Sequence, residues 1–244
     1  MIEVDTTPLP VPTVRAAFRA AATDFYYQSL RLVPANVAWG AAFLAVTAIG
    51  FWLSPVLALV AAPSLCLPLV GVARLAAQIV RGEDVVLSDA PTAIREFARP
   101  ALAAGVVVVL ATVVLTANVV VGISGGGPIG WAFATLAAWG LAALWIAGLA
   151  FWPILTDPAR HATPLAARAR LAVFVVLAYP VRFASLAAGL ALVTIVSAIA
   201  FAALLSVSVA FMALVASRVT LPAADQLEAR LVLAAATPDA IGQA

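Results

Sequence analysis

Residues 101–123 form an uninterrupted apolar run without a single ionisable side chain. As an α-helix the run would be roughly 34 Å long at about 1.5 Å per residue, enough to cross a hydrocarbon core about 30 Å thick. In lipid the backbone groups must be paired within the structure, so only helices and closed barrels span a membrane, and the alternating pattern of barrel strands is absent. The run therefore predicts a transmembrane helix.

The composition of the chain extends this conclusion to the whole protein. Of the 244 residues, 65% are hydrophobic and 10% are charged, whereas soluble domains carry roughly 25% charged residues. The net charge is only +2 and the arginines lie beside apolar runs, where they act as topology signals, so we expect no nucleic-acid partner. The sequence predicts an all-α, polytopic transmembrane helix bundle.

The chain divides into a tail, a membrane domain and a second tail. We expect residues 1–12 to be a disordered N-terminal tail and residues 13–217 to form a single transmembrane helical domain. Residues 218–244 are expected to be a short C-terminal tail with a short soluble helix. Residues 13–32 have the periodicity of an amphipathic helix. This helix either lies in the membrane interface with its phenylalanines toward acyl chains or packs on the protein's own cytoplasmic face.

Prolines, charges and lengths divide the membrane domain into about six spans. Ser54 and Pro55 predict a turn between the first two, and Pro63 and Pro68 predict a kink in the second. The last apolar stretch, 183–217, is too long for one upright span and rather short for two, which leaves five spans as an alternative. A weak internal repeat, in which an amphipathic interfacial helix leads into a hairpin of spans, favours six. The expected spans are about 35–53, 56–73, 101–123, 131–152, 183–199 and 200–217.

Charges at the two ends of the central span indicate its orientation. Arg95 and Arg99 precede the run, whereas the glycine-rich turn at 124–128 carries no charge. Arginine-rich flanks remain in the cytoplasm. We therefore expect the turn on the outer side of the membrane and the N-terminus in the cytoplasm.

Two charged segments are expected on the cytoplasmic side. In residues 74–99, Gly82 is predicted to end the preceding helix, and Asp89 is predicted to cap a short helix. In residues 153–170, Thr163 and the proline that follows it predict the start of another helix.

These segments contain the candidate contacts with partners or lipid. Arg160 and His161 can grip a lipid phosphate, since a guanidinium suits phosphate geometry. The alternative is a solvated loop with ordinary charges. Within the membrane, Asn36 and Asn118 suit interhelical hydrogen bonds, and Arg182 suits anchoring by snorkelling. The candidate contacts are Arg95, Arg99, Asp157, Arg160, His161, Arg168 and Arg170.

The sequence offers no grouping of side chains typical of catalysis or of a metal site. Cys66 and His161 are the only cysteine and the only histidine, which excludes an intramolecular disulfide and a cysteine-based zinc site. The apolar runs contain no Asp, Glu, His or Lys. We therefore expect a non-enzymatic protein without a cofactor or a metal.

Four features lie in a fixed order along the chain. They are an N-terminal helix entering NVAW at residues 36–39, a proline-containing second span leading to Gly71 and Arg74, a charged loop with Phe97, and the string FWPILTDPARHATPLAARARLAVFVVLAYP from Phe151. Together they resemble the YesL-like membrane proteins of bacteria over residues 25–217. The chain departs from that pattern in lacking lysines in its loops and in its longer C-terminal tail.

The resemblance implies a protein of the bacterial cytoplasmic membrane with an accessory role beside carbohydrate-uptake transporters and no assigned catalytic residues. We expect a non-enzymatic accessory or assembly subunit of a larger membrane complex, with membrane lipids and other membrane subunits as partners. One alternative is a small transporter or channel with a cavity beside Pro63, Pro68 and Asn118. Another is an interfacial lipid-binding protein that uses Arg160 and His161.

Overall fold

The computed structural model describes residues 11–236, and all regular secondary structure in this range is helical. The described residues contain no strand. In chain order the elements are α1 (Val14–Tyr27), α2 (Ser29–Trp52), α3 (Pro55–Ala61), the 3₁₀ turn η1 (Ala62–Leu65), α4 (Cys66–Arg81), α5 (Asp89–Gly125), α6 (Gly127–Thr156), the 3₁₀ turn η2 (Pro158–Arg160), α7 (Leu165–Ala178), α8 (Pro180–Ile199), α9 (Phe201–Ala203), the π-helical turn η3 (Leu204–Ser208) and α10 (Val209–Ala236).

Six helical segments are long and apolar enough to cross a membrane. They are Ser29–Trp52, Pro55–Arg81, Asp89–Gly125, Gly127–Thr156, Pro180–Ile199 and Leu205–Ala234. The predicted all-α, multi-pass fold is therefore confirmed for the described residues, with six candidate spans rather than five. The last apolar stretch is divided after α8, where Ala200 leaves the helical conformation with φ −93° and ψ 71°.

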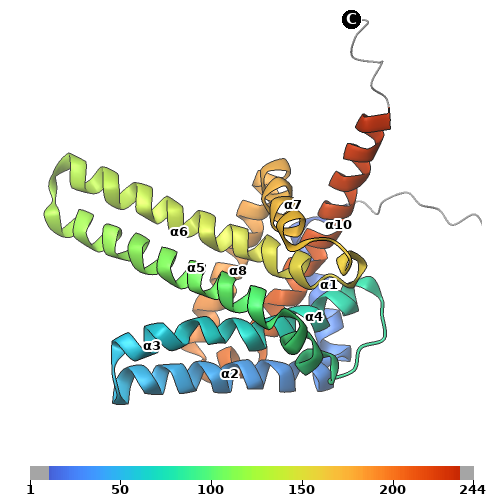
Figure 1. The fold of residues 1–244 in the computed structure, drawn as a ribbon, viewed down its shortest axis with the longest axis horizontal. Helices are drawn as coiled ribbons and strands as arrows, with labels where there is room; N and C mark the ends of the chain where they lie inside the picture. The colour runs from blue at the N-terminus through green and yellow to red at the C-terminus, as the bar shows by residue number, and fades with distance from the viewer. Residues whose placement is uncertain (1–10, 237–244) are drawn as a thin grey trace, which may run out of the picture.

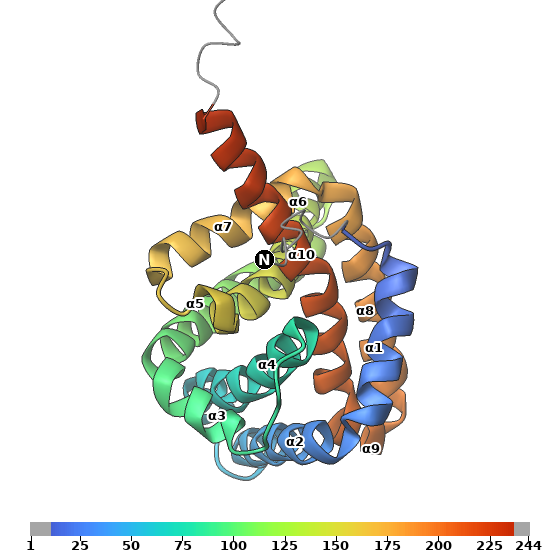
Figure 2. The ribbon, with the colours of Figure 1, turned by 90° about the vertical axis from the view of Figure 1, so that its right-hand side faces the viewer.

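The helices are arranged around α10. Figure 1 shows α2, α3, α5 and α6 running along the long axis of the molecule, and the α5–α6 hairpin reaching beyond the turn between α2 and α3. Viewed from the end in Figure 2, α10 passes through the middle of the bundle, where it contacts α1, α4 and α6. Each candidate span contains a most apolar stretch of 18 residues. Of this stretch, 67% is buried in Leu205–Ala234, which covers most of α10, and 6% is buried in α5. The core of the protein therefore lies around α10, and the α5–α6 hairpin forms its outer part.

The N-terminal amphipathic helix packs on the protein itself. Its small residues Ala17 and Ala21 are buried, and the rings of Phe18 and Phe25 both meet Phe211 of α10 edge-on, with ring centroids 5.9 and 6.5 Å apart. Of the two predicted placements, the structure shows the packed one. The phenylalanines face α10 rather than acyl chains.

The connection between α4 and α5 is much shorter than expected. The sequence predicts a charged loop at 74–99, but α4 continues to Arg81 and α5 begins at Asp89. Gly82 ends α4 in the left-handed conformation with φ 72°, as predicted. The predicted short helix after Asp89 is wrong, because α5 passes through Pro100 without a break. A proline removes only one backbone bond, and packing against α4 supports the helix on both sides of it.

The predicted C-terminal boundary at Arg218 is also wrong, because α10 is one helix over Val209–Ala236. The residues on either side of Arg218 are buried, and Nε of Arg218 donates to Asp24 of α1 at 2.8 Å. The charge is paired inside the bundle and therefore does not end the helix. Residues 1–10 and 237–244 of the two predicted tails lie outside the described residues.

The outer tip of the α5–α6 hairpin depends on a close approach between two glycines. A Cβ atom on Gly122 would lie 2.6 Å from the carbonyl oxygen of Gly130 and 2.9 Å from the backbone nitrogen of Ala134. Small residues at such positions let two membrane helices pack backbone to backbone. The hairpin therefore has no room for a side chain at residue 122.

We expect Gly122→Ala to destabilise the protein by about 1–3 kcal/mol, the usual effect of overpacking. Gly148→Ala is the matched control, because a Cβ at residue 148 meets only Nε1 of Trp152, at 4.0 Å. Alanine favours a helix over glycine, so the control should keep or raise the midpoint of thermal unfolding. Equal midpoints for the two variants would contradict the close packing of the hairpin tip.

Candidate functional site

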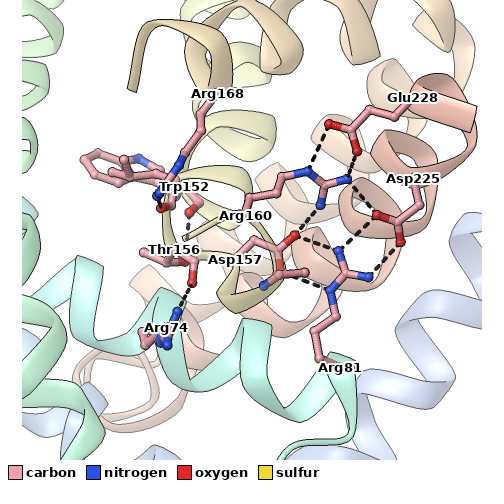
Figure 3. A network of polar contacts seen from close by, with 11 residues as sticks. Arg74, Arg81, Trp152, Thr156, Asp157, Arg160, Arg168, Asp225 and Glu228 are labelled. Atoms are coloured by element: carbon pink, nitrogen blue, oxygen red, sulfur yellow. Dashed lines mark hydrogen bonds and ion pairs between the residues drawn. The ribbon is translucent and has the colours of Figure 1, made fainter. Parts of the chain in front are cut away.

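Charged side chains from three distant parts of the chain meet at one end of the bundle (Figure 3). They come from the end of α4, from the connection between α6 and α7, and from the C-terminal half of α10. We call them the ionic cluster, which consists of Arg81, Asp157, Arg160, Asp225 and Glu228.

Arg81 joins α4 to the other two parts of the ionic cluster. Its Nε and Nη2 donate to the two carboxylate oxygens of Asp157 at 3.0 and 2.6 Å. Its Nη1 and Nη2 donate to the carboxylate of Asp225 at 2.7 and 3.0 Å. The planar, forked guanidinium is suited to such paired bonds. Arg81 thereby connects α4, the end of α6 and α10.

Arg160 lies at the centre of the ionic cluster. Its guanidinium donates to Asp157, to Asp225 at 2.6 Å and to Glu228 at 2.5 Å. The side chain is 5% exposed, and that of Asp157 is fully buried. Burial lowers the pKa of Arg160, but the bonds to Glu228 and Asp225 and the charge of Asp157 outweigh this effect and raise the pKa. Arg160 therefore stays charged.

This pairing corrects the prediction of a lipid contact through Arg160. A lipid phosphate would have to displace carboxylates from a guanidinium that the fold has buried among three of them. Breaking a buried ion pair is strongly destabilising. Arg160 holds the protein together and is not available to a headgroup.

Two further arginines bind the carbonyl end of α6. Nη1 of Arg168 donates to the carbonyl oxygen of Leu155 at 2.6 Å, and Nη1 of Arg74 donates to that of Thr156 at 2.9 Å. The last carbonyls of a helix have no partner within the helix, and positive charge is favourable there. Arg168 is buried and also lies over the ring of Phe97, 5.7 Å from its centroid. Its role is to fix the ends of α6 and α7 against α5.

The remaining candidates of the two charged segments lie on the surface. Nδ1 of His161 is 3.0 Å from a carboxylate oxygen of Glu96, and both side chains are exposed. Arg95, Arg99 and Arg170 are exposed, and none makes an ion pair or hydrogen bond with a described residue. The surface therefore carries three arginines that the other described residues leave unpaired.

The sequence pointed to only part of the ionic cluster. Asp157 and Arg160 were predicted contacts, and Arg168 lies beside them. Of their partners, the two acids on α10 lie outside the two segments that the sequence marked for contacts, whereas the arginine lies within residues 74–99 but was not among the candidates. A spacing of three residues puts two acids on one face of a helix, so continuing the helix past residue 218 would have revealed the pair. The missed partners are Arg81, Asp225 and Glu228.

The three polar candidates within the spans have different surroundings. Asn36 is fully buried, its amide nitrogen donates to the carbonyl of Leu205 at 2.9 Å, and its amide oxygen accepts from the backbone nitrogen of Ala210 at 2.7 Å. This confirms its predicted interhelical bonding. Arg182 donates to a backbone carbonyl of the N-terminal segment at 2.8 Å. Asn118 is exposed and makes no hydrogen bond with a described residue.

An apolar cavity of about 390 Å³ lies between α4, α5, α6 and α10. Val108 and Thr112 of α5 form one wall, and Met212 of α10 lies among the lining residues. The sequence placed a cavity beside Pro63, Pro68 and Asn118, and none of them belongs to this lining. Pro68 instead lines a second pocket, of about 480 Å³, between α2, α4 and the start of α5. The 390 Å³ cavity suits an apolar chain and offers it no charged group.

Comparison with protein-family models, with curated proteins and with solved structures finds no match to this chain. The described residues contain no group of three His, Cys, Asp or Glu side chains placed to hold a metal ion. The charged end combines a partly buried ionic cluster, which joins α4, α6 and α10, with surface arginines that the described residues leave unpaired.

Proposed function

We propose that this multi-pass membrane protein is a non-enzymatic accessory or assembly subunit of a larger membrane complex. The observation that carries the proposal is that the rest of the bundle buries so little of the apolar part of α5. Only 6% of its most apolar window is buried, against 67% for α10. A span that packs on α4 and α6 but leaves most of its apolar stretch exposed is available to lipids and to the spans of other subunits.

Helix α5 exposes an apolar surface along its membrane part and a basic surface at its charged end. Its membrane part exposes a series of valines and leucines. Its charged end exposes Arg95 and Arg99, which are four residues apart and so lie on the same side of the helix. A partner with an apolar span and an acidic segment next to it would match both surfaces. The large exposed apolar residues are Leu102, Val106, Val107, Val108, Leu110, Val113, Val114, Val120, Val121 and Ile123.

The resemblance to the YesL-like family supports the same role. It adds that the complex would be a carbohydrate-uptake system in the bacterial cytoplasmic membrane, and the arginines that flank α5 favour a cytoplasmic N-terminus. A coupled transporter is less well supported, because coupling normally requires ionisable groups facing a cavity. The residues that line the 390 Å³ cavity include none.

Reversing two charges on α5 tests the proposal. We expect the double variant Arg95→Glu, Arg99→Glu to reduce the recovery of associated subunits by about tenfold or more, because like charges would then face the acidic segment of the partner. The measurement is co-purification of the tagged protein in mild detergent from the cells that naturally produce it, with quantitative mass spectrometry.

The control is Arg15→Glu with Arg19→Glu on α1, another exposed pair of arginines with the same spacing. This variant makes the same change in net charge and should retain the partners. Loss of partners from both variants, or from neither, would contradict a binding role for the charged end of α5.

A further inference from the structure

Asn118 presents a primary amide on the exposed side of α5. The residue lies inside the apolar run 101–123, and α5 ends at Gly125, so the amide is about 10 Å below the outer end of the helix. This depth is within the hydrocarbon core of a membrane. An unpaired amide there is unfavourable, because neither lipid tails nor water offers it a hydrogen bond.

The other asparagine of the chain, Asn36, has its side-chain amide hydrogen-bonded within the fold. Asn36 uses both its amide nitrogen and its amide oxygen, each on the backbone of the segment that leads into α10. Thr47 satisfies its hydroxyl on its own helix, through the carbonyl oxygen of Phe43 at 2.9 Å. Asn118 has neither kind of bond. Its partner must therefore come from outside the described chain.

A second copy of the chain supplies a partner at the required depth. Two copies inserted in the same direction place residue 118 at the same level of the membrane. An asparagine side chain carries both a donor and an acceptor, so two of them can donate to each other. In a two-fold interface a residue near the axis meets its own counterpart. A different protein would need a polar side chain at this same depth by coincidence.

The surroundings of Asn118 allow a second helix to approach. Val114 and Val121, one turn to either side, are 58% and 69% exposed, and Ala117 is also exposed. None of these side chains is long, so two helices can pack closely along this face. Figure 1 shows the α5–α6 hairpin reaching beyond the neighbouring helices, so its outer part is open to a second copy.

We propose that two copies of this protein pair through α5, with the Asn118 amide of each copy donating a hydrogen bond to the amide oxygen of the other. The interface is centred on Asn118 and flanked by Val114 and Val121. It uses the outer half of α5 and leaves Arg95 and Arg99, at the opposite end, free for the partner proposed above. Pairing of copies does not depend on that partner.

The test counts the copies of fluorescently labelled protein by photobleaching in lipid vesicles at a low ratio of protein to lipid. We expect the unaltered protein to be dimeric. Asn118→Leu should raise the dissociation constant in the bilayer by about tenfold, the effect of losing interhelical hydrogen bonds, whereas Asn118→Gln, which keeps the amide, should retain pairing. Thr116→Val removes a polar group two residues away, on the opposite side of α5, and serves as the control.

Each outcome decides the proposal. A monomeric unaltered protein, or an Asn118→Leu variant that pairs as well as the unaltered protein, would overturn it. Asn118 is exposed, so its substitution should not impair folding, and equal thermal midpoints of the single chains in dissociating detergent check this. Co-purification distinguishes this proposal from the accessory function. If the Asn118→Leu variant no longer pairs but still retains other subunits, pairing has failed while the accessory function has not.

Discussion

Replacing Asp157 by alanine is expected to reduce the free energy of unfolding by about 3–5 kcal/mol, the range for removing one partner of a buried ion pair. Asp157 is fully buried and binds both Arg81 and Arg160. Without its carboxylate, the buried guanidinium of Arg160 retains only Asp225 and Glu228, which are closer to the surface. The backbone nitrogen of Ala159 also loses the acceptor that caps turn η2.

The measurement is reversible unfolding in mixed micelles, followed by circular dichroism. Asp84→Ala is the matched control, because it removes an acid from the exposed connection after α4 and should change the free energy by less than about 0.5 kcal/mol. Similar unfolding curves for the two variants would mean that the ionic cluster does not hold the three elements together.

Asn36→Leu is expected to have the second large effect. The substitution leaves the carbonyl of Leu205 and the backbone nitrogen of Ala210 without their partners. Each unpaired buried group costs about 1–3 kcal/mol. The loss is severe because η3 is a π-helical turn, where the regular helical bonding is interrupted, and the Asn36 side chain bridges that interruption.

Asn118→Leu is the matched control for Asn36→Leu, because it makes the same chemical change at an exposed position that has no hydrogen bond to a described residue. Measured on monomers in detergent, it should leave the unfolding curve unchanged. If Asn36→Leu unfolds at the same denaturant concentration as Asn118→Leu, the buried amide contributes nothing to stability, contrary to its observed contacts.

The features that depend on local sequence could be predicted. Long apolar runs indicated five or six spans, and the weak internal repeat favoured six. Ser54 accepts a hydrogen bond from Val56 at the predicted turn, with Pro55 in the first turn of α3. Gly82 ends α4 as expected for a glycine in the left-handed conformation. These residues act through their own backbone preferences, which neighbours far away in the sequence hardly change.

Charges paired over long distances could not be predicted in the same way. Arg218 looks like the end of a span, but Asp24 pairs with it across the bundle and the helix continues. Arg160 looks like a free guanidinium on a loop, but Glu228 and its neighbours bury it. In both cases the deciding residue lies far away in the sequence, and local composition contains no sign of the contact.

The surfaces proposed to bind partners are ones that the described residues leave exposed. Neither Asn118 nor the pair Arg95 and Arg99 is used by the fold of the described residues. Both lie on α5, the span that the chain itself buries least. We therefore propose that α5 serves assembly.

The most direct test of this account is the composition of the complex that carries the unaltered, tagged protein out of its native membrane in mild detergent. The account predicts that mass spectrometry recovers at least one other membrane protein in stoichiometric amount. Recovery of this chain alone, as a monomer or as a pair of identical copies, would contradict the accessory role.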